Sequence, residues 1–258
     1  LKKNHTIVNS RILFKKYLKI CKNINIVKTT TLSKKDFFDR EDTCLGSKIH
    51  LLYTGRVQWE KGLAELLDAF SEIRKTKTNL HLNIVGWEDD TKKPVETELK
   101  ILCQKLNIEA FVTFHGFKSV GHELNEMYRM ADIYILPSYH EGFPRTIWEA
   151  MANSLPVICT SVGSIPLELV NEQDALIVQP KRGQEIEKAI NRLLTNPSIR
   201  RSLIKNGRVK ASNNTLEKQT KQLSVLLPQI YSCSFNSFFI ILISQYLQIP
   251  KFIIHFIL

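Results

Sequence analysis

Short apolar runs alternate with amphipathic stretches along residues 48–178 of the chain. The runs carry few polar positions, so they predict strands that are buried on both faces. We expect these strands at residues 49–53, 80–85, 111–114, 132–136, 156–159 and 175–178.

The stretches between the runs repeat their apolar residues every three or four positions, as on one face of a helix. In the first stretch, this spacing is kept by Leu63, Leu66, Leu67, Phe70 and Ile73. We expect helices over about 61–75, 94–106, 119–130 and 144–153, and further helices after 178 up to about 230.

Strands that alternate with helices predict an α/β fold, with a Rossmann-like parallel sheet and helices on both faces. In such sheets, ligands bind at the carboxyl ends of the strands. The loops that follow residues 53, 85, 114, 136 and 159 are therefore the candidate binding loops.

Composition and charge narrow the class of protein. The chain has 258 residues, is 43% hydrophobic and carries a formal charge of +11, which excludes a disordered or collagen-like chain. Residues 1–35 hold ten Lys and Arg and no Asp or Glu, whereas the remainder is nearly balanced. We therefore expect a local basic patch and no nucleic-acid partner.

The basic segment has two interpretations. Leu13, Tyr17 and Cys21 recur at helical spacing between lysines. Such a helix either packs its apolar stripe within a domain or lies on an anionic membrane surface. We expect residues 1–48 to be the remnant of an upstream domain plus a linker, and residues 49–230 to be the main domain.

Residues 231–258 change abruptly in composition, with Lys251 as their only Lys, Arg, Asp or Glu. The continuous apolar run at 238–243 is far shorter than the roughly 20 residues that a spanning helix needs. We interpret this tail as a membrane-associating segment or an out-of-frame extension. The chain begins at Leu1 without a signal peptide, and we expect it to be a piece of a longer protein.

The five cysteines lie singly, which predicts neither a disulfide framework nor a structural zinc site and favours a reducing, cytoplasmic location.

The loop after the first strand contains Gly55 and Arg56, followed by Lys61 and Gly62 at the expected start of a helix. Two cations at a helix N-terminus, where backbone N–H groups already attract anions, are suited to a diphosphate. The alternative is an ordinary turn with a surface Arg and Lys.

A second group of residues follows the strand at 132–136. Glu141 precedes Gly142, Phe143 and a helix-starting proline, and Glu149 comes eight residues later. The two carboxylates are placed to contact different parts of one extended ligand. The alternatives are a helix-flanking acid for Glu141 and a solvated face for Glu149. The apolar neighbours of Glu149 favour partial burial, and a buried acid needs a partner.

Together with Thr160–Pro166, these motifs resemble the C-terminal, sugar-donor-binding domain of GT-B retaining glycosyltransferases of family 4. The resemblance covers roughly residues 24–227. It implies transfer of a sugar from a nucleotide-diphosphate sugar to a glycan or lipid-linked glycan, with retention of configuration. It also implies that no metal or other cofactor is needed, because cations and a helix N-terminus take the place of a metal.

The resemblance also implies roles for single residues. Arg56 and Lys61, with Gly55 beside them, would hold the diphosphate as it leaves. Glu141, with the amides of Gly142 and Phe143, would bind the sugar hydroxyls; Arg56, Lys61 and Glu141 are thus the expected catalytic residues. Glu149 would bind the ribose, and Phe117 would lie beside the nucleobase.

The chain departs from the family pattern in three places. Ser164 stands where a second glycine is common, Leu167 separates Glu168 from the Ile-Pro pair, and most of the acceptor domain is absent. We carry no role onto Glu168. Two other functions remain: a module that binds a nucleotide-sugar without turnover, and a nucleotide-sugar epimerase. For a transferase, we expect a cytoplasmic enzyme, with the membrane-surface interpretation of residues 1–35 placing it at the inner face of the membrane.

Overall fold

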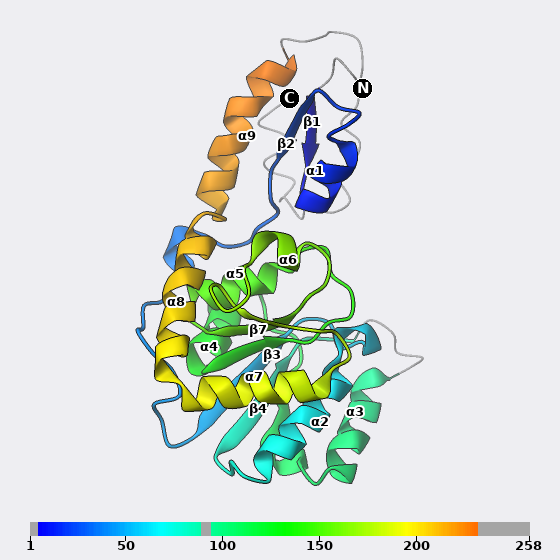
Figure 1. The fold of residues 1–258 in the computed structure, drawn as a ribbon, viewed down its shortest axis with the longest axis vertical. Coiled ribbons are helices and arrows are strands. Elements are labelled where there is room, and N and C mark those ends of the chain that lie inside the picture. Colours follow the sequence, from blue (N-terminus) through cyan, green and yellow to red (C-terminus); the bar gives the residue numbers. More distant parts are fainter. Residues whose placement is uncertain (1–4, 89–93, 232–258) are drawn as a thin grey trace.

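The computed structural model describes residues 5–88 and 94–231 (Figure 1). Its strands are β1 (His5–Val8), β2 (Asn23–Ile26), β3 (Ile49–Thr54), β4 (Leu80–Val85), β5 (Val112–Phe114), β6 (Ile133–Leu136), β7 (Val157–Thr160) and β8 (Leu176–Val178). Its helices are α1 (Arg11–Tyr17), α2 (Leu63–Arg74), α3 (Val95–Lys105), α4 (His122–Met130), α5 (Arg145–Ala152), α6 (Ile165–Glu168), α7 (Gly183–Thr195), α8 (Pro197–Ser212) and α9 (Leu216–Tyr231). Short 3₁₀ turns occur at Lys34–Asp36, Trp59–Lys61 and Glu109–Phe111.

The main sheet of the described residues has six strands in the order β5-β4-β3-β6-β7-β8, and every neighbouring pair is parallel. Every residue of β6 and β7 is buried, as expected for strands covered on both faces. The predicted Rossmann-like α/β fold is confirmed.

Two helix layers cover this sheet. Helix α2 packs beside α3 and α7, and α5 packs beside α4 and α8, so that the sheet lies between the two groups (Figure 1). The predicted apolar stripe of α2, from Leu63 to Ile73, is buried. The helix itself begins at Leu63 rather than at Lys61, because residues 59–61 form a separate 3₁₀ turn.

The order of the strands reverses beside β3. The chain builds β4 and β5 outward on one side of β3 and then returns to place β6 on the other side. The loops after β3 and β6 consequently diverge at the switch point of the sheet, where α/β folds bind their ligands.

The N-terminal residues form a β1–α1–β2 unit with two parallel strands. Helix α9 runs beside this unit (Figure 1), and the Gln222 Nε2 group donates to the Ile26 carbonyl over 2.8 Å. The expected apolar stripe from Leu13 to Cys21 does not form one helix. Helix α1 ends at Tyr17 and has no buried residue, whereas Cys21 is buried beyond its end.

Strand β1 and helix α6, each four residues long, were not expected from the sequence. In the part of the chain that the structure describes, the cysteines are free thiols. Cys233 and residues 232–258, nearly all of the predicted apolar tail, lie outside the described residues.

Candidate functional site

Glycines join the ends of three neighbouring strands. The Gly55 N–H donates to the Val85 carbonyl over 3.0 Å, and the Gly86 N–H donates to the Gly116 carbonyl over 2.9 Å. A Cβ atom on Gly86 would lie 1.7 Å from the Gly55 carbonyl oxygen, so no side chain fits there. This contact sets the path of the loop that carries Arg56, whose side chain is exposed.

Lys61 and Glu141 come together across the switch point. The Lys61 ammonium lies 2.6 Å from Glu141 Oε1, and the side chains are only 16% and 12% exposed. The backbone supports the contact, since the Tyr139 N–H donates to the Glu60 carbonyl over 2.8 Å. The structure thus joins two of the predicted site residues in a half-buried ion pair.

The loop that contains Glu141 rests on the loop after β7. Gly163 has a φ of +57°, and a Cβ atom there would lie 1.9 Å from the Glu141 carbonyl oxygen. The next residue, Ser164, donates its N–H to the Gly142 carbonyl over 2.7 Å. The Ser164 side chain is fully buried, and the contact between the two loops is made by its backbone. This departure from the family pattern therefore leaves the contact intact.

Phe143 and Trp148 stack at the start of α5, with ring centroids 4.4 Å apart and planes at 19°. The stack packs the Phe143 ring against the helix, while Gly142 beside it is exposed. The Gly142–Phe143 segment is therefore anchored on one side and open on the other.

Glu149 is buried in α5, as its apolar neighbours predicted, and it has two partners. The Thr31 hydroxyl donates to Oε1 over 2.6 Å, and the Tyr128 hydroxyl donates to Oε2 over 3.0 Å. Burial, followed by the charge of Glu149, raises the pKa of Tyr128 well above its usual value, so its hydroxyl stays protonated.

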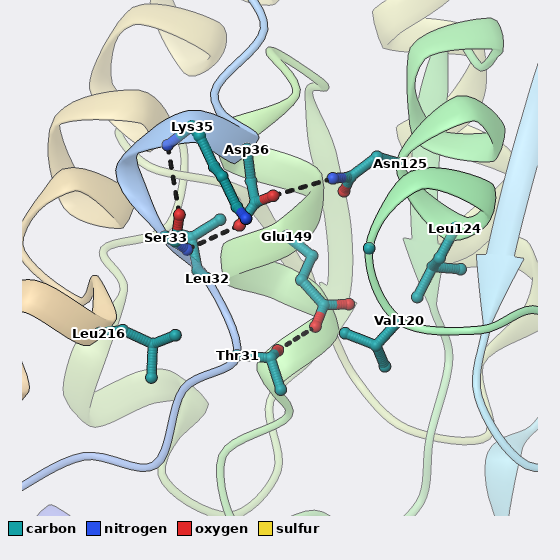
Figure 2. A pocket seen from close by; sticks show the side chains of 11 residues that line it. Thr31, Leu32, Ser33, Lys35, Asp36, Val120, Leu124, Asn125, Glu149 and Leu216 are labelled. Atoms are coloured by element: carbon teal, nitrogen blue, oxygen red, sulfur yellow. Dashed lines mark hydrogen bonds between the residues drawn. The ribbon is translucent and has the colours of Figure 1, made fainter.

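A cavity of about 310 Å³ opens beside Glu149 (Figure 2). Besides Glu149, its lining combines residues 31–33, 35 and 36 of the linker with residues at the start of α4 and with Leu216 of α9. The Asn125 side chain closes one part of it by donating to Asp36 Oδ1 over 3.1 Å.

Phe117 lies beyond the end of β5 and is 61% exposed. It meets the Trp87 ring edge to face, with centroids 5.4 Å apart. Both rings follow strand ends of the main sheet, so they form an exposed aromatic pair at the carboxyl edge of the strands.

The sequence did not single out Tyr128 or Thr31, and it gave Glu168 no role. Tyr128 follows the helical apolar spacing of α4, so it looks like an ordinary core residue. Glu168 accepts from Arg11 Nε over 3.1 Å and from Lys28 Nζ over 2.7 Å. These partners are far apart in the sequence, and no local sequence pattern predicts that they pair.

His81 and His115 each have a polar side-chain partner. His81 Nε2 lies 2.8 Å from Thr113 Oγ1, and His115 Nε2 lies 2.9 Å from Asn83 Oδ1. Burial lowers the pKa of both rings, that of His81 to about 4.

Among the described residues, no group of three or more His, Cys, Asp or Glu is arranged to hold a metal ion. None of the helices in residues 5–88 and 94–231 has the length and apolar character to cross a membrane.

The sequence and the fold of this chain are similar to those of known glycosyltransferases. The capsular polysaccharide biosynthesis glycosyltransferase CapM of Staphylococcus aureus is 27% identical over 184 residues, which are 68% of this chain and 47% of that relative. The structure of sucrose-phosphate synthase from Thermosynechococcus elongatus is 29% identical, with a TM-score of 0.73 over 88% of this chain and 58% of that one.

A third similarity, to Anabaena HepE in complex with UDP, concerns the fold alone. It has a TM-score of 0.77 at 18% identity and covers 88% of this chain and 64% of that one. The matched part of the chain is therefore 47% to 64% of these three proteins. Residues 35–210 match the model of the family described as glycosyl transferases group 1. Since this match covers more than half of the chain, the chain belongs to the glycosyl transferases group 1 family.

Proposed function

We propose that this chain is the sugar-donor-binding part of a retaining glycosyltransferase. It would take a nucleotide-diphosphate sugar and deliver the sugar to a glycan or a lipid-linked glycan. The observation that carries the proposal is the Lys61–Glu141 ion pair at the switch point of the sheet, with side-chain atoms 2.6 Å apart.

The ion pair is suited to the bond that would break. A sugar held by Glu141 and a phosphate held by Lys61 would place the sugar–oxygen bond beside the pair. Arg56 and the N-terminus of α2 would add positive charge for the leaving diphosphate, without a metal. In a retaining transfer, the acceptor attacks from the face on which this diphosphate leaves.

The remaining residues would bind the rest of the sugar donor. The Gly142 and Phe143 amides would bind sugar hydroxyls, Glu149 would bind the ribose, and Phe117 would contact the base. Uridine is the first base to test, since UDP is the nucleotide in the HepE complex. The similarity to CapM supports a polysaccharide-type acceptor.

We assign the reaction to the cytoplasmic side of a membrane, with the basic residues 1–35 as the contact to anionic lipid. Flotation of the protein with vesicles that contain phosphatidylglycerol, compared with neutral vesicles, tests this part. Equal flotation with both would contradict it.

The central test is a thermal-shift and calorimetric panel of UDP, GDP and ADP with their sugar conjugates, since a ligand that binds only the folded state raises its melting temperature. We expect one nucleotide series to bind, with its sugar conjugate binding tighter. A hydrolysis and transfer assay then separates the transferase from the binding-only module, and NMR of the product anomer tests retention. Failure of all three series to bind would overturn the proposal.

A further inference from the structure

A chain of buried hydroxyl groups leads to Glu149 from behind. Tyr134, Thr54 and Tyr128 are each at most 3% exposed. Thr54 Oγ1 lies 3.2 Å from the Tyr134 hydroxyl and 2.7 Å from the Tyr128 hydroxyl, which in turn lies 3.0 Å from Glu149 Oε2. Because these hydroxyl groups are buried away from water, each relies on its neighbours in the network for a hydrogen-bond partner.

The direction of these bonds follows from the carboxylate at the end. A carboxylate only accepts hydrogen bonds, so Tyr128 must donate its single proton to Glu149. Thr54 must then donate to the Tyr128 hydroxyl, and the Tyr134 hydroxyl, which lies 3.2 Å from Thr54 Oγ1, donates to the Thr54 backbone carbonyl over 3.4 Å. The Tyr128 hydroxyl therefore gives its single proton to Oε2 of Glu149, while Thr54 acts as a donor to Tyr128.

The other oxygen of Glu149 has a different environment. Oε1 accepts from Thr31, a half-buried residue in the linker between β2 and β3. Thr31 and Glu149 both line the 310 Å³ cavity, together with Val120 and Leu124 (Figure 2). A ligand hydroxyl in this cavity could replace the Thr31 hydroxyl without disturbing the buried network.

We propose that Tyr128 is a positioning residue for Glu149: it holds Oε2, so that Oε1 can exchange the Thr31 hydroxyl for a ribose hydroxyl of the nucleotide. This inference rests on the proposed function and adds to it a division of labour between the two carboxylate oxygens. Tyr128 itself would not touch the ligand.

The test uses the whole chain and two ligands, UDP and 2′,3′-dideoxy-UDP, with dissociation constants measured by calorimetry. Tyr128→Phe keeps the ring and removes the hydroxyl. We expect it to weaken UDP about tenfold and to leave dideoxy-UDP within about twofold, as for a hydrogen bond to a charged group. Tyr17→Phe, a change of the same kind on α1, should alter neither constant.

Thr31→Val tests the exchange with the opposite sign. Because the ligand no longer displaces a protein hydroxyl, UDP should bind about threefold tighter, while dideoxy-UDP changes little. Thr54→Val provides a second test of the buried network, and it should weaken UDP selectively, but less than Tyr128→Phe does.

Three results would overturn the inference. Tyr128→Phe that weakens both ligands equally would show a purely structural role, and Tyr128→Phe that weakens neither would show no role. Thr31→Val that weakens UDP selectively would show that Thr31 assists the ligand rather than yields to it. If the unaltered chain binds neither UDP, GDP nor ADP, the proposed function fails first and this inference fails with it.

Discussion

Lys61 and Glu141 belong to loops that diverge from adjacent strands, yet their charged groups meet at 2.6 Å in a half-buried contact. Partial burial strengthens the attraction between them, and it also makes either group costly to leave unpaired. If Lys61 binds the phosphate as proposed, the ligand meets a cation that Glu141 already orients.

Removal of the cations should weaken nucleotide binding. We expect Lys61→Ala and Arg56→Ala each to cost more than about 1 kcal/mol of UDP binding free energy, because charged hydrogen bonds to phosphate are strong. Calorimetry measures the loss. The control is Lys75→Ala, which removes an exposed lysine that pairs with Glu72 on α2. Unchanged UDP affinity in both site variants would refute the diphosphate site.

Substitution of Glu149 and of Glu141 should affect the binding of different ligands. Glu149→Ala should weaken plain UDP, because it removes the ribose contact. Glu141→Ala should not weaken UDP, and the freed Lys61 ammonium should hold its phosphate at least as well. The same Glu141 change should weaken UDP-sugar relative to UDP by about tenfold. Binding constants for both ligands, measured on both variants, give the comparison; parallel losses would contradict the division.

Periodicity was sufficient to predict the main sheet, because strands and helices of this fold follow from local spacing. The apolar stripe of α2 predicted its buried face, and the strand-end glycines directed attention to Gly55 and to the loop beyond it. Lys61 and Glu141 were singled out because each belongs to the segment that follows a strand, at the edge where parallel sheets bind ligands.

The partners of the acids could not be predicted in the same way. Thr31 is 118 positions from Glu149, and Arg11 is 157 positions from Glu168. Such pairs depend on how the linker and the N-terminal unit fold back onto the main domain. The spacing of Tyr128 fits core packing, and only the structure shows that its hydroxyl meets a carboxylate.

Binding of the nucleotide should not require a metal. If Lys61, Arg56 and the start of α2 neutralise the diphosphate, then UDP affinity in EDTA should equal that in Mg²⁺ within about twofold. Titrations in the two buffers at equal ionic strength test this, because salt alone weakens charged contacts. A strong gain with Mg²⁺ would show that the protein cations are insufficient.

Acid should destabilise the β3–β4–β5 end of the sheet. Burial lowers the pKa of His81 to about 4, and its Nδ1 is buried without a hydrogen-bond partner. The unfolded chain, in which the ring has its ordinary pKa near 6.5, therefore binds more protons than the folded chain between these values. The stability of the fold should fall as the pH drops from about 6.5 toward 4.

Because the His81 ring is partly exposed, we expect the loss in free energy of unfolding at pH 5.5 to be limited to about 1 kcal/mol. His81→Asn should flatten the dependence of the melting temperature on pH in this window. The exposed His122→Asn should leave the slope as it is. Equal slopes for the unaltered chain and His81→Asn would contradict the assignment.

Glu168 should anchor the N-terminal unit to the main domain. Its carboxylate is 6% exposed and receives Arg11 from α1 and Lys28 from the segment after β2, over 3.1 and 2.7 Å. A buried carboxylate with two cations is strongly coupled to both, and its neutralisation leaves the cations without their shared partner.

We expect Glu168→Gln to lower the free energy of unfolding by about 2 kcal/mol. The loss should be smaller than for a fully buried pair, because Arg11 is half exposed. Urea unfolding measures the loss, and limited proteolysis of the linker should become faster. The matched control is Glu126→Gln, which breaks a half-exposed pair with Arg129 within α4 and should change the melting temperature by no more than about one degree. If both variants behave alike, the ion pairs of Glu168 add little stability, and the N-terminal unit is held to the main domain by other contacts, such as those of α9.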